Sequence, residues 1–396
     1  MPVAARVADF DKSMSRFDAF LESISFLKSS RDADVNNLVL GNPQEMPLLP
    51  LVDSLQRNAT PRNKDWFAYK FSEPQSQSVV AASLRDELGV PFEPEDIALT
   101  TGAFGALSVA LQTVVDPGDE VIINLPPWSH YEALTVAAGG VPVKIMVDRE
   151  SFDLDLDAIA AAITPRTRVV IVNTPNNPTG KIYPKSTLER LATILEDASA
   201  RNGRRIYLIS DEPYRKIIFE DTPFTSPLGL YPYAMMTYSY GKVTLAPGQR
   251  IGYLALSPDM PDRPDVRKAI RLVQIGLGFL FPNALLQHAL PELESMSIDI
   301  DHLRRKRDRL VGALQDIGYD VHVPEGTFYV LPRSPLDDDM AFIEMLADRD
   351  TLCLPGSVLE FPGFFRVSLT ASDEMIERAI PVFADVFRKV KEQKAA

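Results

Sequence analysis

The sequence has little cysteine and little histidine. Among its 396 residues there are one cysteine and four histidines. The single cysteine, Cys353, excludes an intramolecular disulfide and favours a reducing compartment. It lies in an apolar Leu-Cys-Leu-Pro stretch, where we expect a packed thiol rather than a nucleophile. The histidines are scattered without metal-ligand spacing, so the sequence predicts no metal site.

Excess positive charge and long apolar runs are also lacking. The formal net charge is −13, which argues against nucleic acid or an anionic membrane as a partner, because both select for Lys and Arg. No stretch approaches the about 20 apolar residues of a membrane-spanning helix, and residues 1–17 lack the continuous apolar segment of a secretory signal. We therefore expect a soluble, cytoplasmic protein with small-molecule ligands.

The middle of the chain alternates short apolar runs with helical patterns. A chain of 396 residues is too long for one ordinary core, so two domains are expected. The alternation predicts an α/β fold with a mostly parallel sheet covered on both faces. We expect an antiparallel edge strand at 250–256. The other strands are expected at 96–100, 120–124, 141–147, 169–173, 206–209 and 235–238, with helices between them and at 265–275 and 284–293.

The two chain ends have a different pattern. Apolar residues three or four apart over residues 7–30 predict an amphipathic helix, and 37–41 reads as a short strand that ends at a glycine. A smaller α+β unit is expected after residue 295, packed with the N-terminal segment because chain ends often lie close together. Its expected elements are helices at 300–317, 340–347 and 375–390 and strands at 320–323, 327–331 and 364–369. The predicted boundaries are 1–54 and 296–396 for the small domain and 55–295 for the large one.

Polar side chains gather after two apolar runs in residues 206–253. In α/β proteins, groups at the carboxyl ends of strands face the ligand crevice. The segment offers a carboxylate, a phenol, a hydroxyl, an amine and a guanidinium, from Asp211, Tyr214, Ser239, Lys242 and Arg250. An anionic, nitrogen-containing aromatic cofactor that reacts with an amine needs about this set of groups.

Two further turns follow predicted strands. Gly102 and Ala103 begin a helix, where free N–H groups and the positive end of the helix dipole suit a phosphate. Many such turns carry glycine for packing only, so this turn alone is a weak signal. Residues 173–180, Asn-Thr-Pro-Asn-Asn-Pro-Thr-Gly, force an extended and then turning backbone that presents the Asn177 amide at a strand end.

The order of these motifs resembles a known family. Asn-Asn-Pro-Thr-Gly, then Asp-Glu-Pro-Tyr, then a lysine and an arginine eight residues later, each after a strand, is similar to the fold-type-I pyridoxal-phosphate enzymes of the class I/II aminotransferase superfamily. The resemblance runs from about Leu40 to the C-terminus. It implies an aspartate aminotransferase-like fold with a seven-stranded sheet, pyridoxal 5′-phosphate as cofactor and a homodimer.

The resemblance also implies a role for each candidate residue. Lys242 would be the Schiff-base lysine, and Asp211 would pair with the pyridine nitrogen. The phosphate would be held by Gly102, Ala103, Phe104, Ser239 and Arg250, and by Tyr69 of a neighbouring subunit. Asn177 and Tyr214 would bond the ring oxygen, and Trp128 would stack on the ring. Arg366, with Gly41 and Asn177, would bind the substrate. A core tryptophan and plain turn residues are the structural alternatives for Trp128, Asn177 and Tyr214.

The predicted activity is transfer of an amino group from an amino acid to a 2-oxo acid by ping-pong chemistry. A lyase, a cyclase or an oxidase that activates the same Cα is the alternative, because the named residues do not separate these reactions. A non-catalytic regulator that binds the cofactor is a minor one, since no basic DNA-binding module precedes residue 40.

Two features bear on the substrate and on the lysine loop. An acidic substrate side chain would need a second cation and a basic one a carboxylate, and the apolar residues 276–282 are either pocket or core. Gly241 stands where relatives often carry Ser or Thr, which predicts one phosphate hydroxyl fewer and a looser loop.

Overall fold

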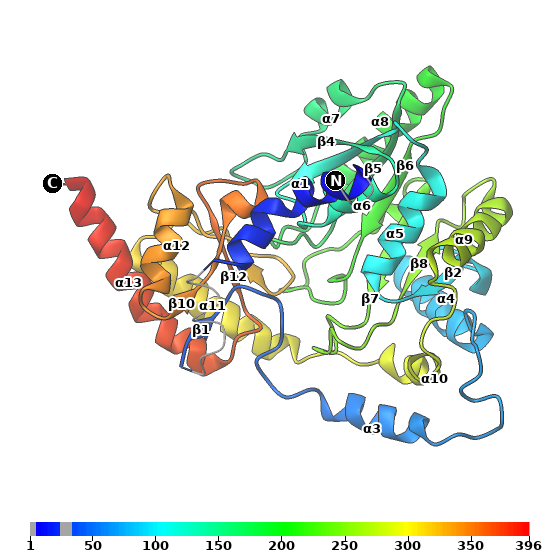
Figure 1. Cartoon of the computed structure of the whole chain (residues 1–396), viewed down its shortest axis with the longest axis horizontal. Helices are drawn as coiled ribbons and strands as arrows, with labels where there is room; N and C mark the ends of the chain where they lie inside the picture. Colours follow the sequence, from blue (N-terminus) through cyan, green and yellow to red (C-terminus); the bar gives the residue numbers. More distant parts are fainter. Residues whose placement is uncertain (1–4, 24–33, 396) are drawn as a thin grey trace.

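A seven-stranded sheet forms the centre of the larger part of the molecule (Figure 1). The computed structural model describes residues 5–23 and 34–395. The strand order is β2-β8-β7-β6-β5-β3-β4. These strands are β2 (Ile97–Thr100), β3 (Glu120–Leu125), β4 (Val141–Met146), β5 (Thr167–Asn173), β6 (Tyr207–Asp211), β7 (Ala234–Ser239) and β8 (Gly252–Leu256). The parallel pairing of β4, β3, β5, β6 and β7 confirms the predicted mostly parallel sheet.

The sequence had suggested an antiparallel strand at the edge of the sheet, but this strand lies inside it. β8 pairs antiparallel with β2 on one side and with β7 on the other. Tyr253, for example, lies between Leu99 and Tyr238. All five residues of β8 are buried, so the strand belongs to the interior of the sheet and β2 forms its edge.

Apolar side chains of the strands alternate between two cores on opposite faces of the sheet. Val121 and Ile123 pack into one core, and Ile122 between them packs into the other, as the period of two in a strand requires. The first core contains residues of α5 (Ala103–Val114), α6 (Tyr131–Ala137) and α9 (Arg263–Leu277). The second contains residues of α3 (Leu49–Ala59), α4 (Pro74–Leu88), α7 (Leu156–Ala162), α8 (Lys185–Asn202) and α10 (Ala284–Leu293).

A third core joins the two ends of the chain. It combines Phe20, Val35 and Leu38 with apolar side chains from residue 298 onward, and it also contains Tyr214, Ile217, Phe219 and Val243 from the middle of the chain. Its elements are α11 (Ile300–Ile317), α12 (Asp339–Ala347), α13 (Asp373–Ala395), β1 (Asn36–Asn37), β9 (Tyr329–Val330), β10 (Thr351–Leu352), β11 (Leu354–Pro355) and β12 (Phe365–Ser368). In Figure 1 these elements lie together beside the sheet, with α13 at the far end. The exact domain boundaries stay predictions.

The N-terminal helix α1 (Ala5–Leu21) lies between the two parts of the molecule (Figure 1). It contacts α6 of the larger part and the short 3₁₀ segment η3 (Gly356–Leu359) of the smaller part. The remaining 3₁₀ segments are η1 (Pro94–Asp96) and η2 (Pro227–Gly229). None of the helices among the described residues combines the length and apolarity that a membrane crossing needs.

Several predicted element bounds were wrong. α1 ends at Leu21, and residues 24–30 of the predicted helix lie outside the described residues. The strand predicted at 37–41 is limited to β1, and that at 320–323 is a single bridge between Val321 and Pro332. Helix α3 was missed because 42–50 is rich in proline, yet Pro50 lies in its first turn, where it removes no helical hydrogen bond.

Candidate active site

One cavity collects nearly all of the predicted site residues. It lies at the carboxyl ends of β5, β6 and β7 and is closed from the other side by β9, β11 and β12. The predicted residues that line it are Gly41, Ala103, Phe104, Trp128, Asn177, Asp211, Tyr214, Ser239, Lys242, Arg250 and Arg366. Groups more than 300 positions apart in the sequence thus meet at one site.

The start of α5 forms an anion cradle. Gly102 has a φ of 83° and is the N-cap of α5, and no described side chain caps this helix end. A Cβ on Gly102 would lie 2.9 Å from Nη2 of Arg250 and 3.3 Å from Oγ of Ser239. Backbone N–H groups of Ala103 and Phe104 and the Arg250 guanidinium therefore surround a space without a side chain, an arrangement that fits a phosphate.

Asp211, the last residue of β6, is held by two hydroxyl groups. The hydroxyl of Tyr131 donates to its Oδ2 at 2.6 Å, and that of Thr237 donates to its Oδ1 at 2.7 Å. Burial raises the pKa of Asp211 to about 6, although these two hydrogen bonds and the charge of Lys242 act to lower it. A buried carboxylate with a fixed orientation suits a protonated ring nitrogen.

Lys242 lies in the loop that follows β7. Its Nζ is 5.5 Å from the ring centre of Tyr214 and 5.7 Å from that of Phe328. The glycine before the lysine had suggested a loose loop, but the structure shows close packing there. A Cβ on Gly241 would lie 2.9 Å from Cα of Pro247, so the chain packs tightly where a side chain would not fit.

Arg366 on β12 points into the cavity from the small unit. Its Nη1 donates to Oδ1 of Asn177 at 3.0 Å and its Nη2 donates to the carbonyl of Val39 at 2.8 Å. Its Nε is buried and has no hydrogen-bond partner among the described groups. An unpartnered buried donor is costly, and a bound carboxylate would satisfy it. Gly41 lies against the Tyr329 side chain, and the Arg366 guanidinium lies over the same tyrosine ring at 4.2 Å.

Aromatic rings form one wall of the cavity. Trp128 stacks on His130 with 4.7 Å between ring centres and meets the edge of Phe104 at 5.0 Å. Phe17 of α1 meets His130 at 5.9 Å and extends this wall. Trp128 thus lines the cavity, and its partly buried side chain also packs against the core that contains α5, α6 and α9. Its stacking on a cofactor ring stays a prediction.

Tyr69 is not brought into the site. Its side chain is 85% exposed, it does not line the cavity, and its ring lies 4.9 Å from that of Phe281. Residues 276–282 also lie outside the cavity lining.

The sequence interpretation missed several lining or supporting residues. They are Phe17, His130, Tyr131, Asn173, Thr237 and Tyr329. Thr237 had a usable signal, since it stands two positions before Ser239 on the same strand and therefore on the same face. Phe17 had none, because its helix reaches the site only through tertiary packing.

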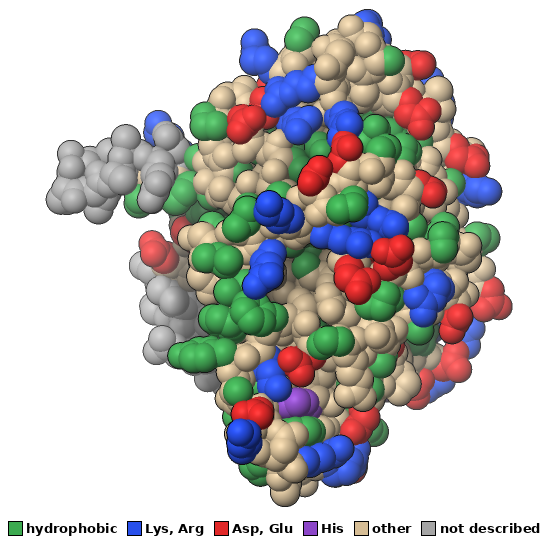
Figure 2. All heavy atoms as spheres, turned by 90° about the vertical axis from the view of Figure 1, so that its right-hand side faces the viewer, with side chains coloured by type: hydrophobic (Ala, Val, Ile, Leu, Met, Phe, Trp, Pro, Cys, Tyr) green, Lys and Arg blue, Asp and Glu red, His purple; other side chains and the backbone are tan. Residues whose placement is uncertain are grey.

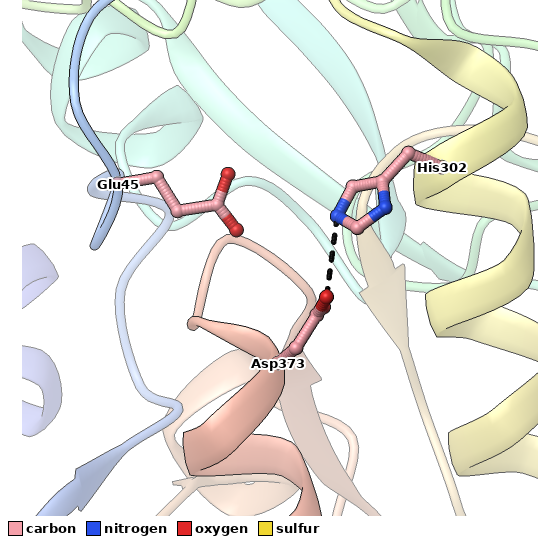
Figure 3. A group of neighbouring side chains, drawn as sticks. All are labelled: Glu45, His302 and Asp373. Atoms are coloured by element: carbon pink, nitrogen blue, oxygen red, sulfur yellow. Dashed lines mark ion pairs between the residues drawn. The ribbon is translucent and has the colours of Figure 1, made fainter.

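A second group of polar side chains lies on the small unit. Glu45, His302 and Asp373 come from three segments, and their ligand atoms lie within 4.8 Å of one another (Figure 3). Nζ of Lys306 is 2.8 Å from Glu45 and 3.3 Å from Asp373. The lysine already supplies the positive charge that these carboxylates need, so we do not interpret the group as a metal site.

Charged side chains also lie behind the site. Glu212, next to Asp211, is fully buried, and its Oε1 accepts from the hydroxyl groups of Ser210 and Ser226 at 2.7 and 2.6 Å. Its Oε2 is 3.3 Å from Nε of Arg215, whose Nη2 pairs with Glu87 at 2.9 Å. Burial raises the pKa of Glu212 to about 7, against the charge of Arg215 and the two serine hydrogen bonds.

Comparison with known proteins identifies the architecture. Residues 36–383 match the family model described as aminotransferase class I and II. The chain belongs to this aminotransferase family. It is 30% identical over 364 residues to a probable aspartate aminotransferase of Methanocaldococcus jannaschii, which covers 90% of this chain and 94% of that protein. It is 33% identical over 347 residues to the aspartate/prephenate aminotransferase of Thermus thermophilus, with 85% and 86% covered.

Solved aminotransferase structures share the fold. An amino transferase from Eubacterium rectale superimposes with a TM-score of 0.89 at 28% identity, over 96% of this chain and 98% of that one. The protein is therefore a pyridoxal-phosphate-dependent aminotransferase, and the predicted fold, cofactor and reaction class are confirmed. Of the predicted reactions, the comparisons support transamination rather than the lyase, cyclase or oxidase alternative.

The buried Glu212 leads to a prediction about stability and pH. Because its pKa is raised from 4.5 to about 7 on folding, the folded chain keeps a proton that the unfolded chain releases between these values. The free energy of unfolding of the cofactor-free protein should therefore fall as the pH rises through this window. Urea titrations at several pH values should show a smaller fall for Glu212→Gln. Glu196→Gln, at an exposed position, is the control and should keep the wild-type dependence. An unchanged dependence in Glu212→Gln would contradict the assignment.

Proposed function

We propose that the aminotransferase moves an amino group from an α-amino acid to a 2-oxo acid in two half-reactions at a single site around Lys242. One observation carries the proposal. The anion cradle at Gly102, the Asp211 carboxylate and the Lys242 amine line the same cavity as the unpartnered Nε of Arg366. A cofactor phosphate and a substrate carboxylate thus have separate cationic partners, Arg250 and Arg366, in the cavity that also contains the amine.

The residues present fit pyridoxal phosphate. The phosphate would lie against Gly102, Ala103, Phe104, Ser239 and Arg250. Asp211 would hold the ring nitrogen, Asn177 and Tyr214 the ring oxygen, and Trp128 would cover the ring. When bound, the cofactor supplies an electron sink that makes the Cα–H bond of an amino acid acidic.

The protein supplies orientation and proton transfer. Arg366 holds the α-carboxylate through its Nε and its remaining N–H groups, while its bonds to Asn177 and Val39 fix the guanidinium. Lys242 takes the proton from the substrate Cα at its Nζ. Asp211, fixed by Tyr131 and Thr237, keeps a proton at the ring nitrogen. The two half-reactions share these groups, which gives ping-pong kinetics.

We further propose a homodimer in which Tyr69 serves the partner's site. Apolar side chains reach the surface on the face that Figure 2 shows, where α9 and α4 lie in Figure 1. Exposed apolar side chains of the segment before α4, of α9 and of the segment after α9 include Phe67, Tyr69, Phe71, Leu272, Ile275 and Phe281. The rings of Tyr69 and Phe71 both contact Phe281, at 4.9 and 5.2 Å, so these side chains form one surface. Exposed aromatic groups in one patch are typical of an interface.

A cytoplasmic location remains part of this proposal. The support is the lone thiol of Cys353, which is fully buried, so that the fold depends on no disulfide.

Lys242→Ala should remove the covalent link between protein and cofactor and all turnover, because no other described amine lines the cavity. Borohydride reduction followed by peptide mapping measures the link directly. Lys185→Ala, which removes an amine from an exposed side chain at the start of α8, should keep both the link and the activity. A mutant at 242 that still forms the reducible link would show that another residue carries the cofactor.

Arg366→Ala should raise KM for all α-amino acids by roughly 10- to 100-fold, because a hydrogen bond to a charged group contributes about 1.5–3 kcal/mol. Steady-state kinetics with several substrates measure the change. Arg309→Ala, which removes an exposed guanidinium paired with Glu377, is the matched control and should leave KM unchanged. If KM were unchanged in Arg366→Ala, the residue would have no place in substrate binding.

Tyr69→Phe should weaken cofactor binding about tenfold through loss of a charge-assisted hydrogen bond. Hybrids of Tyr69→Phe with Lys242→Ala subunits decide where the tyrosine acts. If it acts in the partner's site, half of the hybrid's sites combine an intact lysine with an intact tyrosine and regain wild-type affinity. No recovery, or a monomeric mass in sedimentation, would contradict the proposal.

A further inference from the structure

The charged groups of the cavity are all engaged by the proposed reaction. Of the described residues that line it, Lys242, Arg250 and Arg366 are the lysines and arginines. They are assigned to the amine chemistry, the phosphate and the α-carboxylate. No further lysine or arginine among these residues is left to bind the side-chain carboxylate of an acidic substrate.

The single carboxylate of the described lining is engaged as well. Asp211 accepts hydrogen bonds from Tyr131 and Thr237 and is assigned to the ring nitrogen. His130 offers no cation near neutral pH, because burial lowers its pKa, although Asp18 acts to raise it. Within one subunit, the described lining therefore carries no free partner for a charged side chain of either sign.

Apolar side chains lie next to Arg366, the residue assigned to the substrate α-carboxylate. Leu354 of β11 is the register partner of Arg366 on β12. Leu40 follows Val39, whose carbonyl accepts from Arg366. Both leucines line the cavity, so a substrate held at Arg366 has apolar surface beside it.

Two more apolar groups continue this surface. Leu359 of η3 and Phe17 of α1 also line the cavity, and α1 contacts η3. Phe17 and Leu40 are partly buried and pack against the core that contains Leu354 and Leu359. We call these four residues, Phe17, Leu40, Leu354 and Leu359, the apolar wall.

Cations lie near this wall but outside the main cavity. Lys12, Arg16 and Lys144 line an adjoining cavity, which shares Phe17 and Ser129 with the main one. Lys144 is paired with Glu132 at 2.6 Å and with Glu360 at 2.9 Å, so its charge is neutralised. Arg16 is exposed on α1, next to Phe17, and is the group to test for an acidic substrate.

We propose that the apolar wall binds the substrate side chain and selects α-amino acids with large uncharged side chains, such as leucine, methionine and phenylalanine. This inference rests on the proposed function. The relatives compared above are named for aspartate, an acidic substrate, whereas this inference assigns uncharged substrates to the present chain. It makes Phe17 a specificity-determining residue on the N-terminal helix.

The first test mixes the holoenzyme with single L-amino acids and follows the absorbance of the lysine-bound cofactor in one half-reaction. Leucine, methionine and phenylalanine should react at least about tenfold faster at low concentration than aspartate, glutamate or lysine, the discrimination expected of an apolar pocket. Fastest reaction with a charged amino acid would overturn the inference but not the proposed function. Failure of every amino acid to react would instead refute the proposed function.

Variants of the apolar wall test which residues determine the selectivity for the substrate side chain. Phe17→Ala should lower the ratio of the phenylalanine rate to the alanine rate about tenfold. Val7→Ala removes an exposed apolar side chain from the same helix and should keep the wild-type ratio. Leu359→Ala is the second wall variant, in case Phe17→Ala does not fold. Unchanged ratios in the folded wall variants would overturn the inference.

Binding without turnover provides an independent readout. 3-Phenylpropionate should bind the wild-type holoenzyme more tightly than maleate in calorimetric titrations, and Phe17→Ala should lose this preference. Arg16→Ala should not change the ratio of leucine to aspartate reactivity. A selective loss of aspartate reactivity in Arg16→Ala, or tighter binding of maleate, would show that the site recognises an acidic side chain and would overturn the inference.

Discussion

The site depends on the burial of the Asp211 carboxylate. A charged group removed from water is tolerated only where hydrogen bonds and opposite charge replace its hydration. Here the replacements come from two different elements, the Tyr131 hydroxyl of α6 and the Thr237 hydroxyl of β7. The carboxylate therefore holds its orientation only while α6, β6 and β7 keep their relative positions, which ties the chemistry to the sheet.

Salt bridges and a hydrogen bond also connect the segments that follow β6 and β7 with neighbouring helices. Glu212 follows Asp211 and contacts Arg215, and Arg215 pairs with Glu87 of α4. Lys216 pairs with Glu294, which also accepts from the hydroxyl of Tyr240, two positions before Lys242. These contacts, in which Glu212 and Arg215 are buried and Glu87 is exposed, run from the strand that carries the carboxylate to the loop that carries the lysine. Their energetic value lies in avoiding unpaired buried charge rather than in adding stability.

The sequence predicted the mostly parallel sheet and many of the side chains that line the main cavity, because both are encoded locally. Apolar runs that end in Asp211 and Ser239 mark strand ends, and strand ends of a parallel sheet meet at one edge. Arg366 was placed by resemblance alone, and the structure puts it within hydrogen-bond distance of Asn177. The position of Phe17 at the cavity was not predicted, because the periodicity of a helix does not show which part of the molecule its apolar face contacts. Two-residue strands such as β10 were missed because two residues carry no pattern.

Under the proposed function, the two parts of the molecule have different roles. The sheet presents groups that bind a cofactor and move a proton, and the small unit presents the arginine and the apolar wall that face the substrate. The most direct test of this account is the product balance of one half-reaction. Holoenzyme mixed with an amino acid and no acceptor should give one 2-oxo acid per site, retain the amino group on the enzyme and release no ammonia. Release of ammonia or peroxide, or turnover beyond one equivalent without an acceptor, would contradict it.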